Sequence, residues 1–384
     1  MWRHIASNAL TLLIVIVFLL GGMILWGQSQ YVAEGPLGEQ ICLRVERGSN
    51  VSRVSKSLEN EGAVTSGTIF RLGMDYGELS GKLKAGSYLV PAGSSMSEIA
   101  DIVTRGGAST CGTEVVYRIG VTRSSIRVRT LDPATSRFVE MASFNPVEEP
   151  APDEFVKVRA QNDTRYRIAM AEGVTSWQVV DALKRVDVLE GEVAELPPEG
   201  MLAPDSYEVR VGDKREDLLK QMQEAQEVLL AAAWERRDRD VPLTSPEEAL
   251  VLASIIEKET GVAAERRQVA SVFVNRLNRR MKLQTDPTVI YGITNGQGVL
   301  GRGLRQSELR KATPYNTYVI PALPPGPIAN PGKASIEAAL NPDSTDYIFF
   351  VADGTGGHAF AATLDEHNAN VRKWREIEKQ RANE

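Results

Sequence analysis

A helix that ends in a carboxylate is the part of this 384-residue chain whose residue types most clearly predict chemistry. The sequence SPEE at 245–248 has the form of a capping box, with a serine hydroxyl before the helix and proline at its first position. Leu252, Ile255 and Ile256 recur at helical spacing and form an apolar stripe. Glu259 lies four residues after Ile255, on the same stripe and just before a glycine that interrupts the helix.

The position of Glu259 predicts a raised pKa. An apolar face and a helix C-terminus both disfavour negative charge, so this carboxyl can hold a proton near neutral pH and deliver it as a general acid. Glu257 lies on a different side of the helix. The alternative is a structural role, in which Glu259 forms an ion pair with Arg266 or Arg267.

Polar and aromatic side chains that suit a sugar-binding groove follow in three later segments. These segments are LQTDPTVIYG, the stiff Pro-rich TPYNTYVIPALPPGPIANPG, and IFFVADGTGGHAF. The candidate substrate-binding residues are Gln284, Thr285, Asp286, Tyr315, Asn316, Thr317 and His358. The same composition also serves ordinary loop packing, and His358 could simply form hydrogen bonds within a hairpin.

Composition disfavours several other kinds of chemistry. Three histidines and two cysteines are too few for most Cys/His zinc sites and no H-E-x-x-H motif occurs, so neither a metal nor another cofactor is predicted. The S-x-x-K spacing of penicillin-binding acyltransferases does not occur either. With 44 basic and 50 acidic residues, the net charge of -6 predicts no surface for nucleic acid.

The N-terminal segment predicts a membrane anchor. Residues 9–26 form an apolar run of 18 residues without a charge, long enough to cross the hydrocarbon core as a helix. Arg3 and His4 precede this run and Glu34 follows it, so the positive-inside rule places the N-terminus in the cytoplasm. We expect a single-pass protein of the inner (cytoplasmic) membrane with its catalytic domain outside the cytoplasm. The alternative is a cleaved signal peptide, whose apolar region would be shorter.

The chain as a whole is expected to be an α+β protein with an N-terminal transmembrane helix. The expected parts are 1–27 (cytoplasmic tip and anchor), 40–106 (a small α+β module), 107–165 (a β-rich insertion or linker) and 166–384 (a mixed α+β catalytic domain).

The small module is expected to contain two helices and short strands. Its opening phrase, RVERGSNVSRVSKSLENEGAV, resembles the start of a LysM-like domain, a fold that binds N-acetylglucosamine polymers. The alternative is a spacer that positions the next domain. Cys42 and Cys111 bracket the module on the oxidising side of the membrane, which favours a disulfide over two buried thiols.

Six motifs in a fixed order resemble the YceG-like family of endolytic murein transglycosylases. They are IIEKET, ASVFVNRL, LQTDPTVIYG, TPYNTY, LPPGPIANPG and FVADGTGGHAF, and the resemblance runs from about residue 165 to residue 377. It extends more weakly to the LysM-like module and the anchor. Residues 107–165 depart from the pattern, because this stretch is longer than the usual link between the modules.

The resemblance implies a reaction for Glu259, the second acid of the E-K-E motif. The acid would protonate the β-1,4 bond between N-acetylmuramic acid and N-acetylglucosamine inside a glycan strand, then take the proton of the muramic C6 hydroxyl, giving a 1,6-anhydro end. Asp286 would orient the sugar or stabilise positive charge. As a second catalytic acid it would instead make the enzyme an inverting hydrolase, which is the less favoured interpretation.

A protein of another class remains as the alternative function. It would be a non-catalytic scaffold that binds peptidoglycan glycan strands through the LysM-like module and recruits peptidoglycan synthases. Anhydro-muropeptide products, or their absence with binding retained, distinguish the two.

Overall fold

The computed structural model describes residues 2–46, 48–105, 110–161 and 163–381, with the backbone alone for residues 2–9. It has the mixed α+β architecture expected from the sequence. Two compact units are present. Unit 1 contains 1–116, 127–144 and 149–166, and unit 2 contains 117–126, 145–148 and 167–384.

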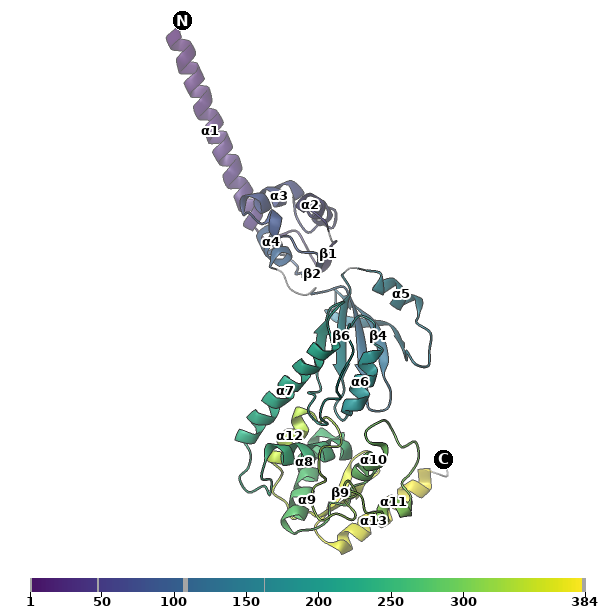
Figure 1. Ribbon diagram of the computed structural model, residues 1–384. Coiled ribbons are helices and arrows are strands. Elements are labelled where there is room, and N and C mark those ends of the chain that lie inside the picture. The colour runs from purple at the N-terminus through teal and green to yellow at the C-terminus, as the bar shows by residue number, and fades with distance from the viewer. Residues whose placement is uncertain (1, 47, 106–109, 162, 382–384) are drawn as a thin grey trace. The chain divides into compact units, whose positions relative to one another are not determined.

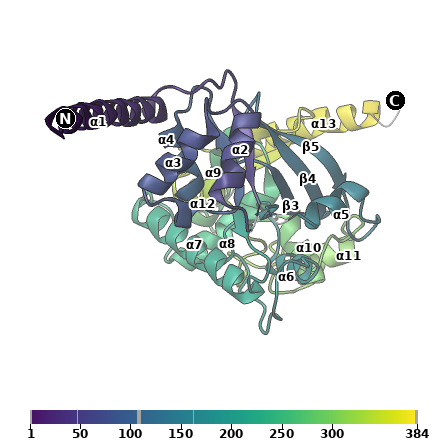
Figure 2. The ribbon, with the colours of Figure 1, turned by 90° about the horizontal axis from the view of Figure 1, so that it is seen from above.

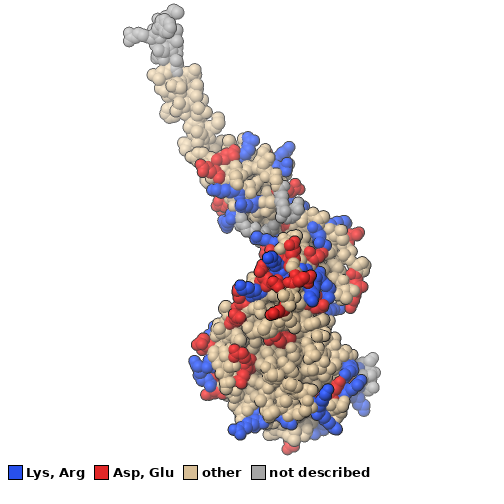
Figure 3. All heavy atoms as spheres, viewed as in Figure 1, with Lys and Arg blue, Asp and Glu red and all other residues tan. Residues whose placement is uncertain are grey.

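Helix α1 (Trp2–Val32) begins unit 1 and is longer than the predicted apolar run of residues 9–26. Among the described helices, one is long and apolar enough to cross a membrane, over Leu10–Val32. Residues 10–33 contain no Lys, Arg, Asp or Glu, and in Figure 3 the described surface of α1 is free of both charge colours. The side chains of Arg3 and His4 lie outside the described residues.

A small α+β module follows α1 in the same unit. Its elements are β1 (Ile41–Val45), α2 (Val51–Asn60), α3 (Gly67–Tyr76), a 3-10 turn (Ser80–Lys82), β2 (Gly86–Val90) and α4 (Met96–Thr104). Strands β1 and β2 pair antiparallel, with Leu43 opposite Tyr88. The three helices gather beside the end of α1 (Figure 2). Helix α3 is an addition to the two expected helices: Ser66 caps it, and Phe70 and Met74 are fully buried.

The chain passes from α1 into this module through a short segment that is bonded to a turn. Gly35 donates its amide to the carbonyl of Gly93 (3.0 Å), and Gly93 donates to the carbonyl of Leu37 (2.8 Å). A Cβ at position 35 would lie 2.1 Å from the carbonyl oxygen of Ser94, so only glycine fits this approach. The expected disulfide between Cys42 and Cys111 is present, which confirms that prediction.

The strands expected from alternation in 107–165 share one sheet with two later strands. The strands are β3 (Thr113–Ile119), β4 (Ser125–Asp132), β5 (Arg137–Phe144), β6 (Arg165–Met170) and β7 (Ser206–Val209). Their order is β5-β4-β3-β6-β7, and a short helix, α5 (Asp153–Arg159), lies between β5 and β6 in sequence.

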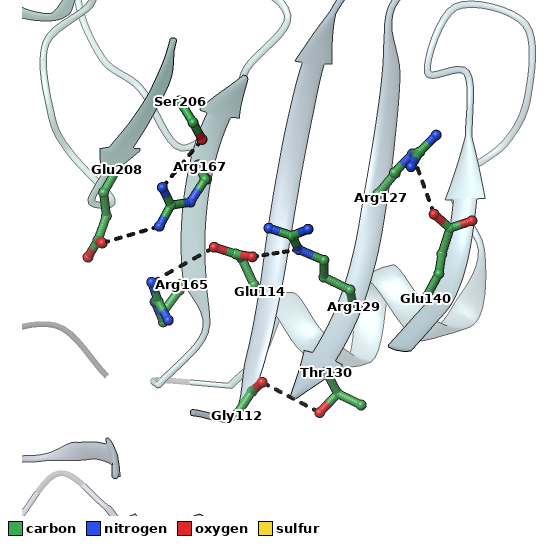
Figure 4. A network of polar contacts seen from close by, with 10 residues as sticks. All are labelled: Gly112, Glu114, Arg127, Arg129, Thr130, Glu140, Arg165, Arg167, Ser206 and Glu208. Atoms are coloured by element: carbon green, nitrogen blue, oxygen red, sulfur yellow. Dashed lines mark hydrogen bonds and ion pairs between the residues drawn. The ribbon is translucent and has the colours of Figure 1, made fainter. Parts of the chain in front are cut away.

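A buried carboxylate pairs with arginines on this sheet. Glu114 on β3 is 1% exposed and accepts a hydrogen bond from Nε of Arg129 on β4 at 2.6 Å (Figure 4). A nitrogen of Arg165 on β6 lies 3.9 Å from the other carboxylate oxygen. A buried charge without a partner is strongly disfavoured, so Glu114 needs these arginines. Because they lie on the two neighbouring strands, the carboxylate links β3, β4 and β6.

Unit 2 contains most of the helices and one hairpin. The helices are α6 (Ser176–Lys184), α7 (Arg215–Glu235), α8 (Pro246–Glu259), α9 (Arg266–Asn278), α10 (Asp286–Thr294), α11 (Gln306–Arg310), α12 (Lys333–Leu340) and α13 (Leu364–Arg381). Strands β8 (Phe349–Ala352) and β9 (His358–Ala361) pair antiparallel. Helices α8, α9 and α12 pack together around the apolar core of the unit (Figure 1).

Helix α8 begins where the sequence predicted, but its capping box is only half formed. Ser245 accepts a hydrogen bond from the amide of Glu248 (3.3 Å). The carboxylate of Glu248 instead accepts from the amide and hydroxyl of Thr244, one residue earlier (2.7 and 2.9 Å). The apolar stripe is confirmed, because Leu252, Ile255 and Ile256 are all fully buried.

Candidate active site

Glu259 is the last residue of α8, and the chain turns to an extended conformation at Thr260 directly after it. Its Oε1 accepts a hydrogen bond from the hydroxyl of Thr285, just before α10. The residue is only partly buried, so it retains access to solvent while its neighbours on the stripe do not.

The pKa of Glu259 is raised, as expected from its position. Burial of the carboxyl is the main cause, and the negative charge of Asp286 adds to it. The hydrogen bond from Thr285 and the positive charges of His358 and Arg276 act in the opposite direction without cancelling the effect. A carboxyl in this state can hold a proton at a higher pH than an ordinary glutamate.

Thr285 is itself held in place by two buried threonines. The hydroxyl of Thr317 accepts a hydrogen bond from the amide of Thr285 (3.0 Å) and forms another with the hydroxyl of Thr288 (2.9 Å). Thr288 donates to the carbonyl of Thr285 (2.8 Å). All three threonines are at most 3% exposed, so the hydroxyl that meets Glu259 sits on a rigid support.

Asp286 opens α10 and lies on the exposed side of the site. The hydroxyl of Tyr318 donates to its Oδ1 at 2.7 Å. Burial together with this carboxylate raises the pKa of Tyr318, so the phenol stays protonated and remains a donor. Asp286 therefore presents a carboxylate whose orientation is set by Tyr318.

His358, at the start of β9, is oriented by a carboxylate 93 residues earlier in the chain. Its Nδ1 lies 2.7 Å from Oε1 of Glu265, and its amide donates to Oε2 of the same side chain (3.0 Å). Thr260, directly after Glu259, donates its hydroxyl to Glu265 (2.6 Å). Burial opposes the charge on Glu265, but these hydrogen bonds prevail and lower its pKa. A carboxylate therefore faces Nδ1 of His358, and the other ring nitrogen remains for a ligand.

Arg276, on α9, is a buried cation close to the site. It donates from Nε to the carbonyl of Ile348 (2.7 Å) and from Nη1 to that of Leu283 (2.6 Å). These bonds connect α9 to the hairpin and to the segment before Thr285. Its charge also acts on Glu259, lowering the pKa of that carboxyl.

The other two residues of the E-K-E motif face different surroundings. Glu257 accepts from the amide of Gly332, just before α12 (3.0 Å), as expected for a residue on another side of the helix. Lys258 donates to the carbonyl of Gly173 (3.2 Å). The structural alternative for Glu259 is not supported, because Arg267 pairs with Asp343 (3.1 Å), and neither Arg266 nor Arg267 is among the groups that shift the pKa of Glu259.

The predicted substrate-binding residues fall into an exposed and an internal group. Gln284 and Asp286 are exposed and His358 is partly exposed. Thr285 and Thr317 are internal, as described above. Gln284 has a left-handed backbone (φ 51°) and donates its amide to the carbonyl of Thr317 (3.2 Å).

Asn316 and Tyr315 are engaged elsewhere in the protein. Asn316 is fully buried; its amide nitrogen donates to three carbonyls of 308–311 (3.1, 3.1 and 2.7 Å), and its oxygen accepts from the amide of Tyr318 (3.0 Å). Tyr315 packs against Tyr291, with ring centroids 5.0 Å apart. This geometry does not favour direct contact between Asn316 and a substrate and assigns that side chain to the loop that carries Tyr318.

Sequence reasoning missed two residues of this site, Glu265 and Arg276. A third, Tyr318, ends the motif TPYNTY in the loop predicted to suit a sugar, but it was not among the candidate binding residues. Glu265 reaches His358 over 93 residues and Arg276 reaches Ile348 over 72 residues, and the sequence carries no local signal for either contact.

Comparison with known proteins identifies relatives that match most of the chain. The YceG-like family profile matches residues 43–373. An endolytic murein transglycosylase of Bacillus subtilis (strain 168) is 30% identical over 362 residues, covering 93% of this chain and 91% of the relative. One of Streptococcus pneumoniae serotype 2 (strain D39 / NCTC 7466) is 28% identical over 338 residues, 86% of this chain and 58% of the relative.

A solved structure of a yceG-like protein from Listeria monocytogenes, at 2.6 Å resolution, is also similar. It is 26% identical, with a TM-score of 0.46, and the match covers 86% of this chain and 99% of that one.

Proposed function

Because the chain belongs to the YceG-like family, we propose that it is an endolytic murein transglycosylase in which Glu259 is the catalytic residue. The observation that carries this assignment is a glutamate at the end of α8 whose carboxyl has a raised pKa and one oxygen bonded to Thr285. The substrate would be the glycan strand of peptidoglycan, cut at internal bonds.

In the first step Glu259 acts as the general acid. Since Oε1 accepts the hydroxyl of Thr285, the proton of the neutral acid is carried by Oε2. This proton passes to the bridging oxygen as the bond between that oxygen and C1 of N-acetylmuramic acid breaks. The raised pKa keeps a supply of the protonated form.

In the second step the same carboxylate acts as a base. It takes the proton of the muramic C6 hydroxyl while O6 bonds to C1, which gives a 1,6-anhydro end and restores the acid. Water is not consumed, so the reaction is a lyase reaction, and it needs no nucleophilic carboxylate of the kind that retaining hydrolases use.

The neighbouring side chains suit a transition state with positive charge at C1. Asp286, held by Tyr318, supplies a negative charge beside Glu259. His358, oriented by Glu265, would donate or accept a hydrogen bond to a sugar hydroxyl through its free ring nitrogen. Gln284 would contact the sugar at the exposed edge.

Membrane anchoring and glycan binding complete the proposal. Helix α1 would act as a single-pass anchor in the inner membrane, with the N-terminus in the cytoplasm and unit 2 outside it. The module within 40–106 would be LysM-like and would bind the glycan. The further domains would be 107–165 and 166–384. Peptidoglycan synthases would be partners.

The test is product analysis with purified full-length protein on peptidoglycan sacculi. Muropeptides released after complete muramidase digestion should include anhydro ends, each lighter by one water than its hydrolytic counterpart. Hydrolytic ends alone would indicate an inverting hydrolase with Asp286 as the second acid. Glycan binding with no new ends of either kind would indicate the scaffold and contradict the proposal.

A further inference from the structure

Helix α3 has apolar residues on its outer face as well as in the core. Phe70 and Met74 are fully buried inside the small module. Ile69, Leu72 and Tyr76 follow one another at helical spacing on the other side, where Leu72 is 58% and Tyr76 86% exposed. A helix of a water-soluble module normally has a polar outer face, so this second apolar stripe indicates a surface that contacts something other than water.

The second stripe forms one wall of an apolar groove of about 910 Å³. The other wall is the last part of α1, from Met23 to Val32. The two helices meet at Gly73, where an added Cβ would lie 2.2 Å from the ring of Tyr31. The groove therefore lies within unit 1, and one of its walls is the segment that is apolar enough to span a membrane.

The length of the span sets the level of the groove. A hydrocarbon core about 30 Å thick takes about 20 residues of helix at 1.5 Å per residue. The uncharged stretch covers residues 5–33, so a span that starts between residues 5 and 10 ends at about residues 24–29. The wall of the groove on α1 extends across this range. Tyr31 and Tyr76 line the groove, as in the aromatic belts at bilayer interfaces, and Trp26 is 57% exposed on α1.

We propose that the outer face of α3 lies in the interfacial layer of the bilayer and that the groove between α1 and α3 holds a lipid acyl chain. The surface of α1 within the span is lipid-facing, and the groove continues that surface without a charged residue among its lining side chains. This inference rests on the proposed membrane anchor.

The test uses the full chain with one added cysteine in lipid nanodiscs. The two native cysteines are bonded to each other, so a thiol-reactive fluorophore will label only Leu72→Cys or Tyr76→Cys. Both positions are exposed, and the label will not disturb the core. Lipids brominated near the headgroup end of their acyl chains should quench the label at both positions, and aqueous iodide should not.

Two further labels serve as controls. Lys56→Cys, on the exposed side of α2 in the same module, should be quenched by iodide alone. Phe18→Cys, in the middle of the apolar span, reports on the anchor itself. If position 18 is quenched by brominated lipid but 72 and 76 respond only to iodide, the groove proposal is wrong and the anchor stands.

The remaining outcomes are equally decisive. No lipid quenching at position 18 would contradict the anchor and, with it, the groove. Protection of positions 72 and 76 from both quenchers would indicate a second copy or a partner helix and would overturn the lipid assignment.

Discussion

The hydroxyl of Thr285 donates a hydrogen bond to Oε1 of Glu259, across 26 residues of sequence that include the whole of α9. The main chain of Thr285 is held by hydrogen bonds with the hydroxyls of Thr317 and Thr288. One carboxylate oxygen of Glu259 thus bonds within the protein, and in the proposed reaction the other oxygen meets the substrate.

Glu259→Gln should lower the rate of glycan cleavage at least about 100-fold, since an amide cannot donate and recover a proton. Glu257→Gln is the matched control on the same helix: its partner is the amide of Gly332, which a glutamine oxygen can still accept, so it should keep substantial activity. Anhydro-end formation by both variants on the same sacculi measures the difference. A stable, inactive Glu257→Gln protein would assign catalysis to the other acid of the motif.

The melting temperature separates this loss from unfolding. Because the pKa of Glu259 is raised in the folded protein, the folded state binds this proton more tightly than the unfolded state. Stability is therefore lost as the pH rises from the ordinary carboxyl pKa through the raised value. Glu259→Gln removes that loss and should melt no lower than the unsubstituted protein at neutral pH. A lower melting temperature, with activity falling in parallel, would favour a structural role.

Thr285→Val and Asp286→Asn should move the alkaline limb of the pH profile in opposite directions. The Thr285 hydrogen bond lowers the pKa of Glu259, so its removal shifts the limb of kcat/KM to higher pH. The Asp286 charge raises that pKa, so its removal shifts the limb to lower pH. Profiles measured across neutral pH test the signs even if both variants are slower. Unchanged limbs would mean that another group titrates.

Glu265→Gln should release His358 and reduce both activity and stability. The carboxylate accepts three hydrogen bonds, and the loss of bonds to a charged group is expected to destabilise by about 1.5–3 kcal/mol. Since the pKa of Glu265 is lowered, this stabilisation is present above the ordinary carboxyl pKa and is lost as the pH falls through the lowered value. Urea melts from acidic to neutral pH measure it. Glu376→Gln, exposed on α13, is the control and should change neither quantity.

Replacing both Cys42 and Cys111 with serine should destabilise unit 1 by about 2–5 kcal/mol, because the bond closes a loop with a sequence separation of 69. The contacts of Glu259 lie wholly in unit 2, so cleavage of soluble glycan fragments at low temperature should be unchanged. Calorimetry with and without reductant checks the first part. Two free thiols in the exported protein, found by mass analysis, would contradict the pairing itself.

A reporter enzyme that is active only outside the cytoplasm should be active when fused to the C-terminus. Arg3 precedes the apolar run, and the positive-inside rule then leads the rest of the chain outward. The same reporter joined directly after residue 8, before the run, should be inactive. If the second fusion were active and the first inactive, the protein would have the opposite orientation in the membrane.

The sequence was sufficient to predict features that depend only on neighbouring residues within one helix or strand. The start of α8, its stripe and the place of Glu259 follow from spacing alone. Helix α3 was missed, although Phe70 and Met74 recur at helical spacing and Ser66 caps the helix.

Side-chain directions in the loops could not be predicted in the same way. Thr317 and Asn316 have the composition of a sugar site, but buried donors and acceptors must be satisfied. The side chain of Thr317 bonds the main chain of Thr285, and that of Asn316 bonds main-chain carbonyls of 308–311. The pairing of Glu265 with His358 depends on where the hairpin meets α9, which no local pattern encodes.

The joint after α1 has a mechanical consequence. A flexible linker lets a membrane-bound domain sweep a volume that grows with linker length. Here Gly35 forms a main-chain hydrogen bond with Gly93 and packs closely against Ser94. The chain is therefore attached to the module as soon as it leaves the helix, and there is no flexible linker at this point. The proposed anchor would therefore hold the module as a rigid support. A tilt of α1 must turn the small module with it, and any reach of this enzyme toward distant glycan has to come from joints farther along the chain.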